Sequence, residues 1–496
     1  MSTPTSLIWF VVIYMAVSIG IGVWAATRVH SAKDYAVAGR RMPFILVTST
    51  VFATWFGAET VLGIPATFLG ENLRGIVADP FGSSICLILA GLFFATKLYR
   101  MNLISIGDYY RIRYNRPVEI IVSIAIVLSY LGWVSAQLTA LGLVFNVVSQ
   151  GAISLQTGIL IGAAIMIAYT AFGGMFSVVF TDAFHMIPLV LGLIYLAWLV
   201  SGMAGGAGYV IEHAQSAGKL EFWPEPKLPK ILAFIGAAVT IMLGSIPQQD
   251  VFQRITSAKT ERIALTSSVA GGSLYFIFAF IPIFLAYSAT LIDPAMVGSL
   301  LVGKGDHDTQ LILPTFILQH TPLFAQIVFF GALLSAITNT ASATLLAPSV
   351  TFTENILREV WKRDWNDRTL LITMRWVVLG FGTAVTLFAL NSDASIFQMV
   401  ENAYKVTLVC AFIPLVMGMY WKRANTTGAM TSVVLGLTVW ITLEITAPEG
   451  LWPPQLAGLL ASFIGMMAGS FLGKPGLFLP DEKASEASGE PGKNGI

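Results

Sequence analysis

Residues 53–65 read Ala-Thr-Trp-Phe-Gly-Ala-Glu-Thr-Val-Leu-Gly-Ile-Pro, in the middle of a long apolar stretch. Residues 242–250 read Met-Leu-Gly-Ser-Ile-Pro-Gln-Gln-Asp, in the middle of another. Proline lacks the N–H that a helix needs, and glycine restrains the backbone least of all residues. Both stretches are therefore predicted to be helices that are interrupted near their middles.

The composition of the whole chain indicates a membrane protein. Of the 496 residues, 56% are hydrophobic and 11% are charged, whereas soluble domains carry about 25% charged residues. These charges are too few to cover the surfaces of several soluble domains. The net charge of +1 gives no indication of a nucleic-acid partner. The two cysteines, Cys86 and Cys410, lie in apolar stretches, so we expect no disulfide framework.

The apolar stretches predict an all-α, polytopic membrane protein with about 13 transmembrane helices, because roughly 20 apolar residues in a helix cross a bilayer. The predicted spans are 6–26, 43–69, 78–99, 118–150, 153–171, 176–203, 231–250, 265–292, 321–347, 369–391, 396–420, 427–446 and 451–473. Residues 1–473 would form one transmembrane domain. Residues 474–496 are rich in Pro, Gly, Ser, Glu and Lys, which predicts a disordered cytoplasmic tail.

The distribution of Lys and Arg predicts how the chain is oriented. With the N-terminus outside, the inward loops and the tail hold 20 Lys and Arg residues and the outward loops hold 5. Cytoplasmic loops carry the excess of positive charge in membrane proteins. We therefore expect the N-terminus outside and the C-terminus in the cytoplasm, in a cell membrane such as the bacterial inner membrane.

The two interrupted spans lie five spans apart. Matched Gly/Pro-interrupted spans in two halves are typical of secondary transporters that are built as inverted repeats. Spans two to six (about 43–203) and seven to eleven (about 231–420) would form a five-plus-five inverted repeat with two discontinuous helices. The alternative is that Gly and Pro are simply tolerated kinks.

The chain resembles the sodium:solute symporter family from Tyr35 to about Leu435. The segments that carry the resemblance are YTAFGG (169–174), VFTD (179–182), GSIPQQDVFQR (244–254), SAITNTAS (335–342) and TENIL (353–357). The resemblance implies a leucine-transporter-type fold, alternating access and sodium as the coupling ion. It also implies that a small-molecule solute and the lipid bilayer are the partners.

Two segments resemble the choline branch of this family. Residues 53–57 are similar to the Ala-Thr-Trp-Val-Gly of that branch, and Trp133 stands where the branch has a second tryptophan of an aromatic cage. Ser83 and Gln248 stand at two other cage positions, so the cage is half built and choline is one open alternative. The expected substrate-binding residues are Trp55, Glu59, Trp133, Gln137 and Gln248.

The resemblance also implies a sodium site between the second and ninth spans. Its ligands would be the backbone carbonyls of Ala53, Phe56 and Ala336 and the side-chain oxygens of Asn339 and Thr340. Residues 336, 339 and 340 share one face of a helix. Asn339 replaces the usual serine of the family. The alternative interpretation of these polar side chains is contact between helices.

Three buried-looking polar residues keep more than one interpretation. Asp182 would lie on the exit path of sodium, or would be an interfacial carboxylate paired with a loop arginine. Glu59 would contact substrate or ion, pair with Lys405, or be protonated. His185, where the family often has glutamine, is more typical of a hydrogen-bonded structural histidine.

The sequence therefore predicts a sodium-coupled symporter that imports a small organic solute with amine or zwitterionic character. The alternatives are a proton-coupled transporter of the same fold, with Glu59 or Asp182 as the relay, and a membrane sensor or channel on the same scaffold. No Cys/His metal cluster, nucleophile elbow or phosphate loop is present in the sequence to indicate an enzyme.

Overall fold

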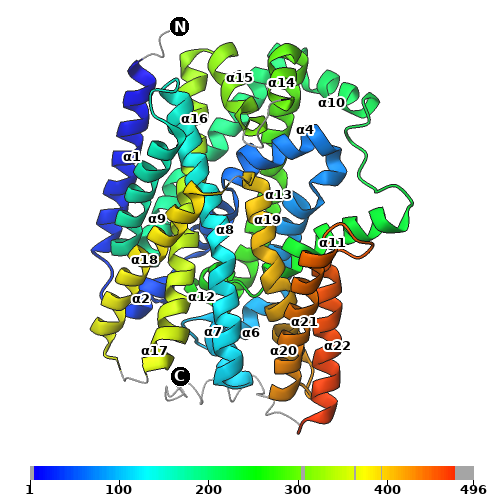
Figure 1. Ribbon diagram of the computed structural model, residues 1–496. Helices are drawn as coiled ribbons and strands as arrows, with labels where there is room; N and C mark the ends of the chain where they lie inside the picture. Colours follow the sequence, from blue (N-terminus) through cyan, green and yellow to red (C-terminus); the bar gives the residue numbers. More distant parts are fainter. Residues whose placement is uncertain (1–4, 303–307, 362–364, 393, 475–496) are drawn as a thin grey trace.

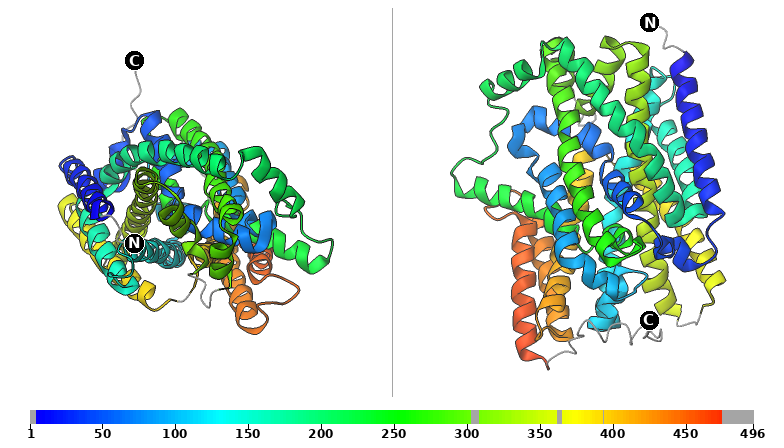
Figure 2. Two further views of the ribbon diagram at one scale, coloured as in Figure 1. Left: turned by 90° about the horizontal axis from the view of Figure 1, so that it is seen from above. Right: turned by 180° about the vertical axis from the view of Figure 1, so that it is seen from behind.

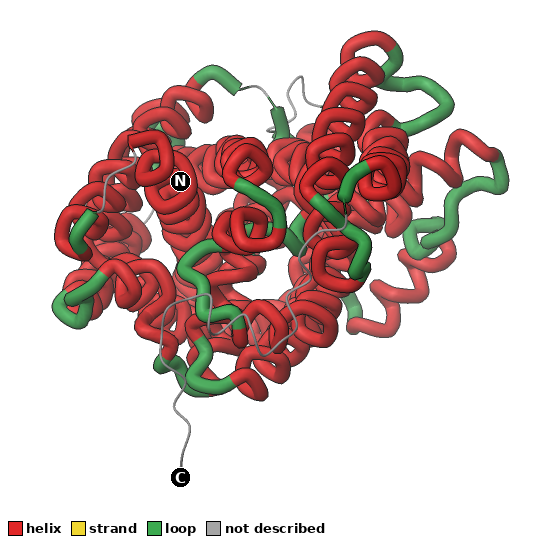
Figure 3. The backbone as a smooth tube through the Cα atoms, turned by 90° about the horizontal axis from the view of Figure 1, so that it is seen from below, coloured by secondary structure: helices red, strands yellow, loops and turns green. Residues whose placement is uncertain are grey.

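The structure is a computed structural model that describes residues 5–302, 308–361, 365–392 and 394–474. Helices make up nearly all of this part of the chain, and no β-strand occurs in it (Figures 1 and 3). The all-α prediction is confirmed. The predicted tail lies outside the described residues, except for Lys474.

The α-helices stand together as one bundle (Figure 1). Their bounds are α1 Thr5–Ala26, α2 Ala32–Val37, α3 Phe44–Trp55, α4 Ile64–Gly75, α5 Ser83–Leu89, α6 Thr96–Arg100, α7 Ile106–Arg113, α8 Arg116–Val148, α9 Leu155–Met203, α10 Ala207–Ser216, α11 Leu228–Gly244, α12 Gln249–Ser257, α13 Glu261–Ile292, α14 Pro294–Leu301, α15 Ile312–His320, α16 Leu323–Thr351, α17 Arg358–Trp361, α18 Asp367–Leu390, α19 Ile396–Thr407, α20 Ile413–Tyr420, α21 Thr426–Thr446 and α22 Pro454–Leu472.

Short segments with other helical hydrogen-bonding patterns connect several of these helices. The 3₁₀ segments are η1 Ala38–Arg40 and η5 Thr309–Leu311. The π-helical segments are η2 Glu59–Gly63, η3 Val77–Gly82, η4 Ala90–Ala95, η6 Phe352–Leu357 and η7 Leu408–Phe412. Such π-helical turns are frequent at functional sites.

Both predicted interruptions are present as bends. The segments Phe44–Trp55 and Glu59–Gly75 meet at 52°, and Leu228–Gly244 and Gln249–Ser257 meet at 43°. In the first break Phe56 leaves the helical region of backbone conformation, with φ −89° and ψ 72°. In the second break Pro247 lacks an N–H to continue the helix. The inverted relation of the two halves stays a prediction.

The number of membrane crossings depends on how α9 is counted. Ten helices of the described chain are long and apolar enough to cross a bilayer, or twelve spans if each bent pair counts as one. α9 has 49 residues, about twice what a bilayer of roughly 30 Å needs, and it contains a break at Gly174, where φ is 52°. The spans predicted at 153–171 and 176–203 both fall within it. The total of 13 stays a prediction.

α16 forms the centre of the bundle, and α1, α21 and α22 stand at its edges (Figures 1 and 2). In the most apolar part of each span, 78% of the residues are buried in the span that contains α16, against 28% in α1 and in α21. α16 packs against α3, α8 and α9, and α8 in turn packs against α19. These contacts bring the first break to the middle of the protein.

The break in α9 depends on the absence of a side chain at Gly174. A Cβ there would lie 2.5 Å from Tyr35 Cδ2 and 2.7 Å from the Tyr35 carbonyl oxygen. The Tyr35 hydroxyl donates to the carbonyls of Thr170 and Ala171, at 3.2 and 3.3 Å. Tyr35 therefore satisfies backbone groups just before the break, as an apolar environment requires.

We predict that Gly174→Ala lowers the stability by about 2 kcal/mol, because it adds both backbone strain and a clash with Tyr35. The thermal unfolding midpoint of the purified protein in detergent measures the change. Gly202→Ala is the matched control, since Gly202 is also in α9 and has no atom within 4 Å of the added Cβ. Equal unfolding midpoints for the two variants would contradict the prediction.

Candidate functional site

The break in α3 frees backbone carbonyls in the middle of the protein. The Thr340 hydroxyl of α16 donates to the Thr54 carbonyl at 2.8 Å, and the Thr60 hydroxyl donates to the Trp55 carbonyl at 3.2 Å. Among the described residues, the backbone hydrogen bonds that leave the regular helices include none to the carbonyls of Ala53 and Phe56. These two oxygens remain available to a ligand.

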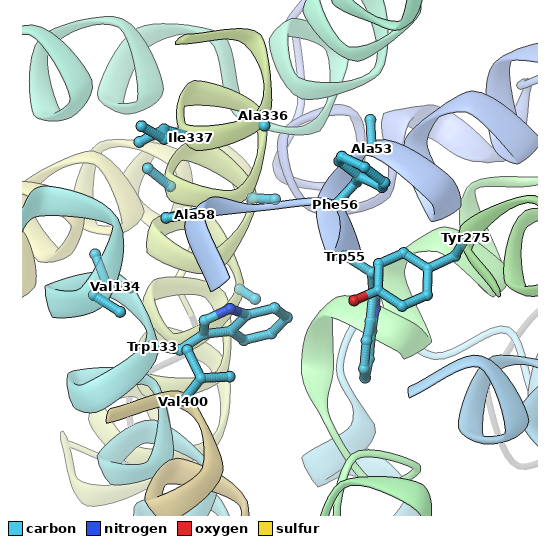
Figure 4. Close-up of a cluster of buried hydrophobic side chains, with 14 of the residues drawn as sticks. Ala53, Trp55, Phe56, Ala58, Trp133, Val134, Tyr275, Ala336, Ile337 and Val400 are labelled. Carbon is cyan, nitrogen blue, oxygen red and sulfur yellow. The ribbon is translucent and has the colours of Figure 1, made fainter. Parts of the chain in front are cut away.

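Figure 4 shows the broken segment between α16, which carries Ala336 and Ile337, and α13, which carries Tyr275. Ala336, Asn339 and Thr340 are all completely buried. The Thr340 hydroxyl uses its only hydrogen on Thr54, so its lone pairs are free to coordinate a cation. Asn339 contacts α9 instead, where its Oδ1 lies 2.6 Å from His185 Nδ1.

The predicted sodium ligands fit a small hard cation in one respect that the structure shows directly. They offer backbone and side-chain oxygens, which are the donors that hard cations prefer. Gly57 keeps the space beside them open, because a Cβ there would lie 2.6 Å from Thr340 Oγ1 and 2.5 Å from Glu59 Oε2. The Glu59 carboxylate and the Thr340 hydroxyl therefore flank one glycine.

Glu59 opens the π-helical segment η2 and is buried, with 2% of its surface exposed. Trp133 Nε1 donates to its Oε1 at 3.0 Å, and Gln137 Nε2 donates to its Oε2 at 2.7 Å. Gln137 Oε1 accepts the backbone N–H of Ala58 at 3.0 Å, so one amide clamps the carboxylate to the break. Three of the five predicted substrate-site residues thus form one hydrogen-bonded unit.

No Lys or Arg among the described residues forms an ion pair with Glu59. Lys405, the partner considered from the sequence, has its Nζ 3.5 Å from Glu444 Oε1. The donors that hold Glu59 are therefore an indole and an amide, both neutral. A buried carboxylate with only neutral donors is costly unless a further positive group approaches it.

An aromatic wall stands beside this carboxylate. The ring centroids of Trp55 and Trp133 are 5.6 Å apart, and Tyr404 of α19 lies 6.1 Å from Trp55 and 5.5 Å from Trp133. Tyr130 stacks on the other side of Trp133 at 6.1 Å. Sequence reasoning did not find Tyr404 or Tyr130, because nothing in their local pattern distinguishes them from packing residues.

Several buried polar atoms at this wall have no hydrogen-bond partner in the described part of the chain. They are Trp55 Nε1, Gln248 Oε1, Asp250 Oδ2 and the Tyr404 hydroxyl. Gln248 Nε2 donates to Ser129 Oγ at 2.8 Å, and Tyr130 donates to Asp250 Oδ1 at 2.5 Å. Unsatisfied buried polar atoms in a native protein need an explanation, and a bound polar ligand is one. Asp250 lies in the second interrupted stretch, and that position was the signal that could have found it.

Asp182 lies on α9 and is completely buried, so it is not at an interface with water. The Thr50 hydroxyl of α3 donates to Asp182 Oδ2, and Oδ1 has no partner within the described chain. No arginine of the described loops forms an ion pair with it. The nearby buried cation is Arg254, which donates to Thr54 Oγ1 at 2.8 Å and to the Asp250 carbonyl at 3.0 Å.

Residues 35–436 match the profile of the sodium:solute symporter family. The high-affinity choline transporter 1 of Torpedo marmorata is 27% identical over 448 residues, which cover 87% of this chain and 75% of that protein. The human sodium/iodide cotransporter is 27% identical over 478 residues, which cover 89% of this chain and 69% of that protein.

A solved structure of a Na⁺-coupled sialic acid symporter, in a substrate-bound outward-open state, superposes with a TM-score of 0.82 at 18% identity. The match covers 96% of this chain and 99% of that one. The leucine-transporter-type fold that the sequence implied is confirmed. The protein is a multi-pass membrane transporter rather than an enzyme, and it belongs to the sodium:solute symporter family.

Proposed function

We propose that this protein couples the entry of sodium to the import of a small organic solute that carries a positively charged amine, as a cation or a zwitterion. The observation that carries the proposal is the buried Glu59 carboxylate, which receives only neutral donors and stands beside an aromatic wall. A cationic amine would supply the missing charge.

The aromatic wall supports a cation in a second way. Aromatic faces attract an ammonium group within about 6 Å of the ring, most strongly when water is excluded. Trp55, Trp133 and Tyr404 are each no more than 3% exposed. Tyr404 adds a third aromatic side chain where Ser83 and Gln248 left the predicted cage incomplete. The unpartnered oxygens of Gln248 and Asp250 would orient the rest of the solute.

The proposed sodium site uses the carbonyls of Ala53, Phe56 and Ala336, the Thr340 hydroxyl and the Asn339 side chain. Helices that unwind in a membrane protein can coordinate an ion with backbone oxygens and no added charge. Asp182 would assist the departing ion, since its free oxygen and its bond to Thr50 place it against α3. Gly57 separates the two sites by one residue, so filling one site would reshape the other.

We also propose the orientation and location that the loop charges predict. The N-terminus would face outward and the C-terminus the cytoplasm of a bacterial cell, across the inner membrane. Residues 1–473 would act as one transport domain, with the two repeats as its moving core. Thermal-shift screening of amines, amino acids and organic acids, with and without sodium, would identify the solute and test the coupling ion.

One observation favours proton coupling as a second candidate. Glu59 and Asp182 are buried carboxyl groups without an ion-pair partner in the described chain, and such groups can carry protons in transporters. Uptake into proteoliposomes with an imposed sodium gradient or an imposed proton gradient separates the two. Uptake that follows the proton gradient and ignores sodium would overturn the primary proposal.

Glu59→Gln tests the amine contact. We predict about a 100-fold rise in the solute concentration that gives half-maximal uptake, because a buried ion pair loses one partner. Glutamine keeps the shape and one acceptor for Trp133, so folding should be preserved. Glu225→Gln, in an exposed loop, is the control with a normal value. Near-normal uptake by Glu59→Gln would refute the contact.

Thr340→Ala tests the sodium site. We predict that the sodium concentration for half-maximal uptake rises about tenfold, because one oxygen ligand is removed. Thr340→Ser keeps the hydroxyl and should stay close to the unmodified protein. If serine and alanine behave alike, the Thr340 hydroxyl is not a ligand.

Gly57→Ala tests the shared glycine. The added Cβ would push Glu59 Oε2 and Thr340 Oγ1 away, since they lie 2.5 and 2.6 Å from its position. We predict a loss of affinity for solute and sodium together, each by about tenfold or more. Gly70→Ala is the control, because Gly70 of α4 has no atom within 4 Å of the added Cβ. A variant that loses affinity for only one of the two would contradict a shared position.

A further inference from the structure

His185 lies in the second half of α9 and is buried, with 1% of its surface exposed. Its Nε2 is 2.7 Å from Ser18 Oγ of α1, and its Nδ1 is 2.6 Å from the Asn339 side chain of α16. Its ring stacks on Tyr14, with centroids 5.5 Å apart. The imidazole therefore joins three helices and touches a proposed sodium ligand.

The hydrogen bonds around Ser18 determine which ring nitrogen carries the hydrogen. The Ser18 hydroxyl donates to the Tyr14 carbonyl at 2.9 Å, and a hydroxyl has one hydrogen to donate. Ser18 Oγ is therefore the acceptor of the hydrogen on His185 Nε2. No carboxylate of the described chain contacts the ring, so a buried imidazole here is neutral. A neutral imidazole with its hydrogen on Nε2 has a lone pair on Nδ1.

The lone pair on His185 Nδ1 determines how the Asn339 amide is turned. With Oδ1 toward the ring, two acceptors would face each other at 2.6 Å, and Nδ2 would stay buried without a partner. With Nδ2 toward the ring, the amide donates to Nδ1 and both conflicts disappear. The two ends of an amide have nearly the same shape, so the hydrogen-bond network decides between them. The amide oxygen then points away from His185.

We propose that His185 is a positioning residue for the coupling ion: in its Nε2–H form, fixed by Ser18, it holds Asn339 with the amide oxygen toward the ion ligands. The inference rests on the proposed function, since it takes residues 336, 339 and 340 as the ion-binding face of α16. A hydroxyl at position 339 would offer an oxygen in every rotation. An amide has a nitrogen end that repels a cation, so it needs a neighbour that selects its orientation.

The test is sodium binding in the absence of solute, measured as the sodium-dependent rise in the unfolding temperature of the purified, full-length protein, with potassium chloride keeping the ionic strength constant. His185→Leu removes the acceptor for Asn339. It should raise the sodium concentration for half-maximal stabilisation by about tenfold or more, as loss of an outer-shell partner does at metal sites. His185→Gln can accept from Asn339 and donate to Ser18, and it should stay within about threefold of the unmodified protein.

Asn339→Ser gives the matched background, because a hydroxyl needs no orienting partner. In that background His185→Leu should leave sodium binding unchanged. Tyr14→Phe is the control for packing, since it keeps the ring beside His185 and loses only the hydroxyl that bonds Ser335. It should bind sodium normally. If His185→Leu does not fold, Ser18→Ala replaces it, and we expect about threefold weaker sodium binding because Nε2 loses its acceptor.

The outcomes separate the two proposals. A sodium response that is equal in the unmodified protein and in His185→Leu overturns the positioning role and leaves the ion site standing. Equal losses in His185→Leu and His185→Gln, or the same loss with Asn339→Ser present, also overturn it. No sodium response in the unmodified protein removes the ion site itself, and the positioning role with it.

Discussion

The break in α3 at residues 56–58 is the constraint on which the rest of the site depends. In a membrane protein, the polar groups of an unwound backbone must find partners inside the protein. Thr340 and Thr60 satisfy two carbonyls at the break, and Gln137 satisfies the N–H of Ala58. The carbonyls of Ala53 and Phe56 are left for a ligand. The groups that stabilise the break are thus the groups that surround the proposed sites.

Electrostatics around the two breaks point in the same direction. Among the described residues, the carboxyl groups of Glu59, Asp182 and Asp250 are buried near the breaks, together with the guanidinium of Arg254. Asp79 joins them through Tyr275, whose hydroxyl donates to Asp79 Oδ1 at 2.6 Å and lies 3.0 Å from Thr60 Oγ1. Acidic groups outnumber the basic one, so positive charge must come from bound ions, solute or protons. A transporter of cations has this balance built into its centre.

Local patterns in the sequence explain what could be predicted. The two breaks follow from glycine and proline at known positions, and the apolar stretches follow from composition. Trp133 and Gln137 were predicted beside Glu59 because the resemblance covers their segments, and their contacts with Glu59 agree with that placement. The division of α9 followed from its glycines. The site assignments as ligands stay predictions.

Contacts between distant segments explain what could not be predicted. Tyr404 reaches Trp55 across 349 positions of sequence, and no local pattern separates it from a packing tyrosine. Lys405 lies beside it in the chain, yet it turns to Glu444, since neighbouring residues of a helix face different directions. His185 was expected to be structural, and only its position between Ser18 and Asn339 indicates what it orients.

The sequence by itself determined that this protein is a helical membrane transporter with two interrupted spans, because those properties depend on composition and on residues close together in the chain. The tertiary structure decided which side chains meet at the break and which carboxylates lack a positive partner. It also decided which aromatic rings complete the wall. Those properties depend on the packing of α3, α8, α9, α16 and α19, and that packing arises from many contacts between helices that no single segment encodes.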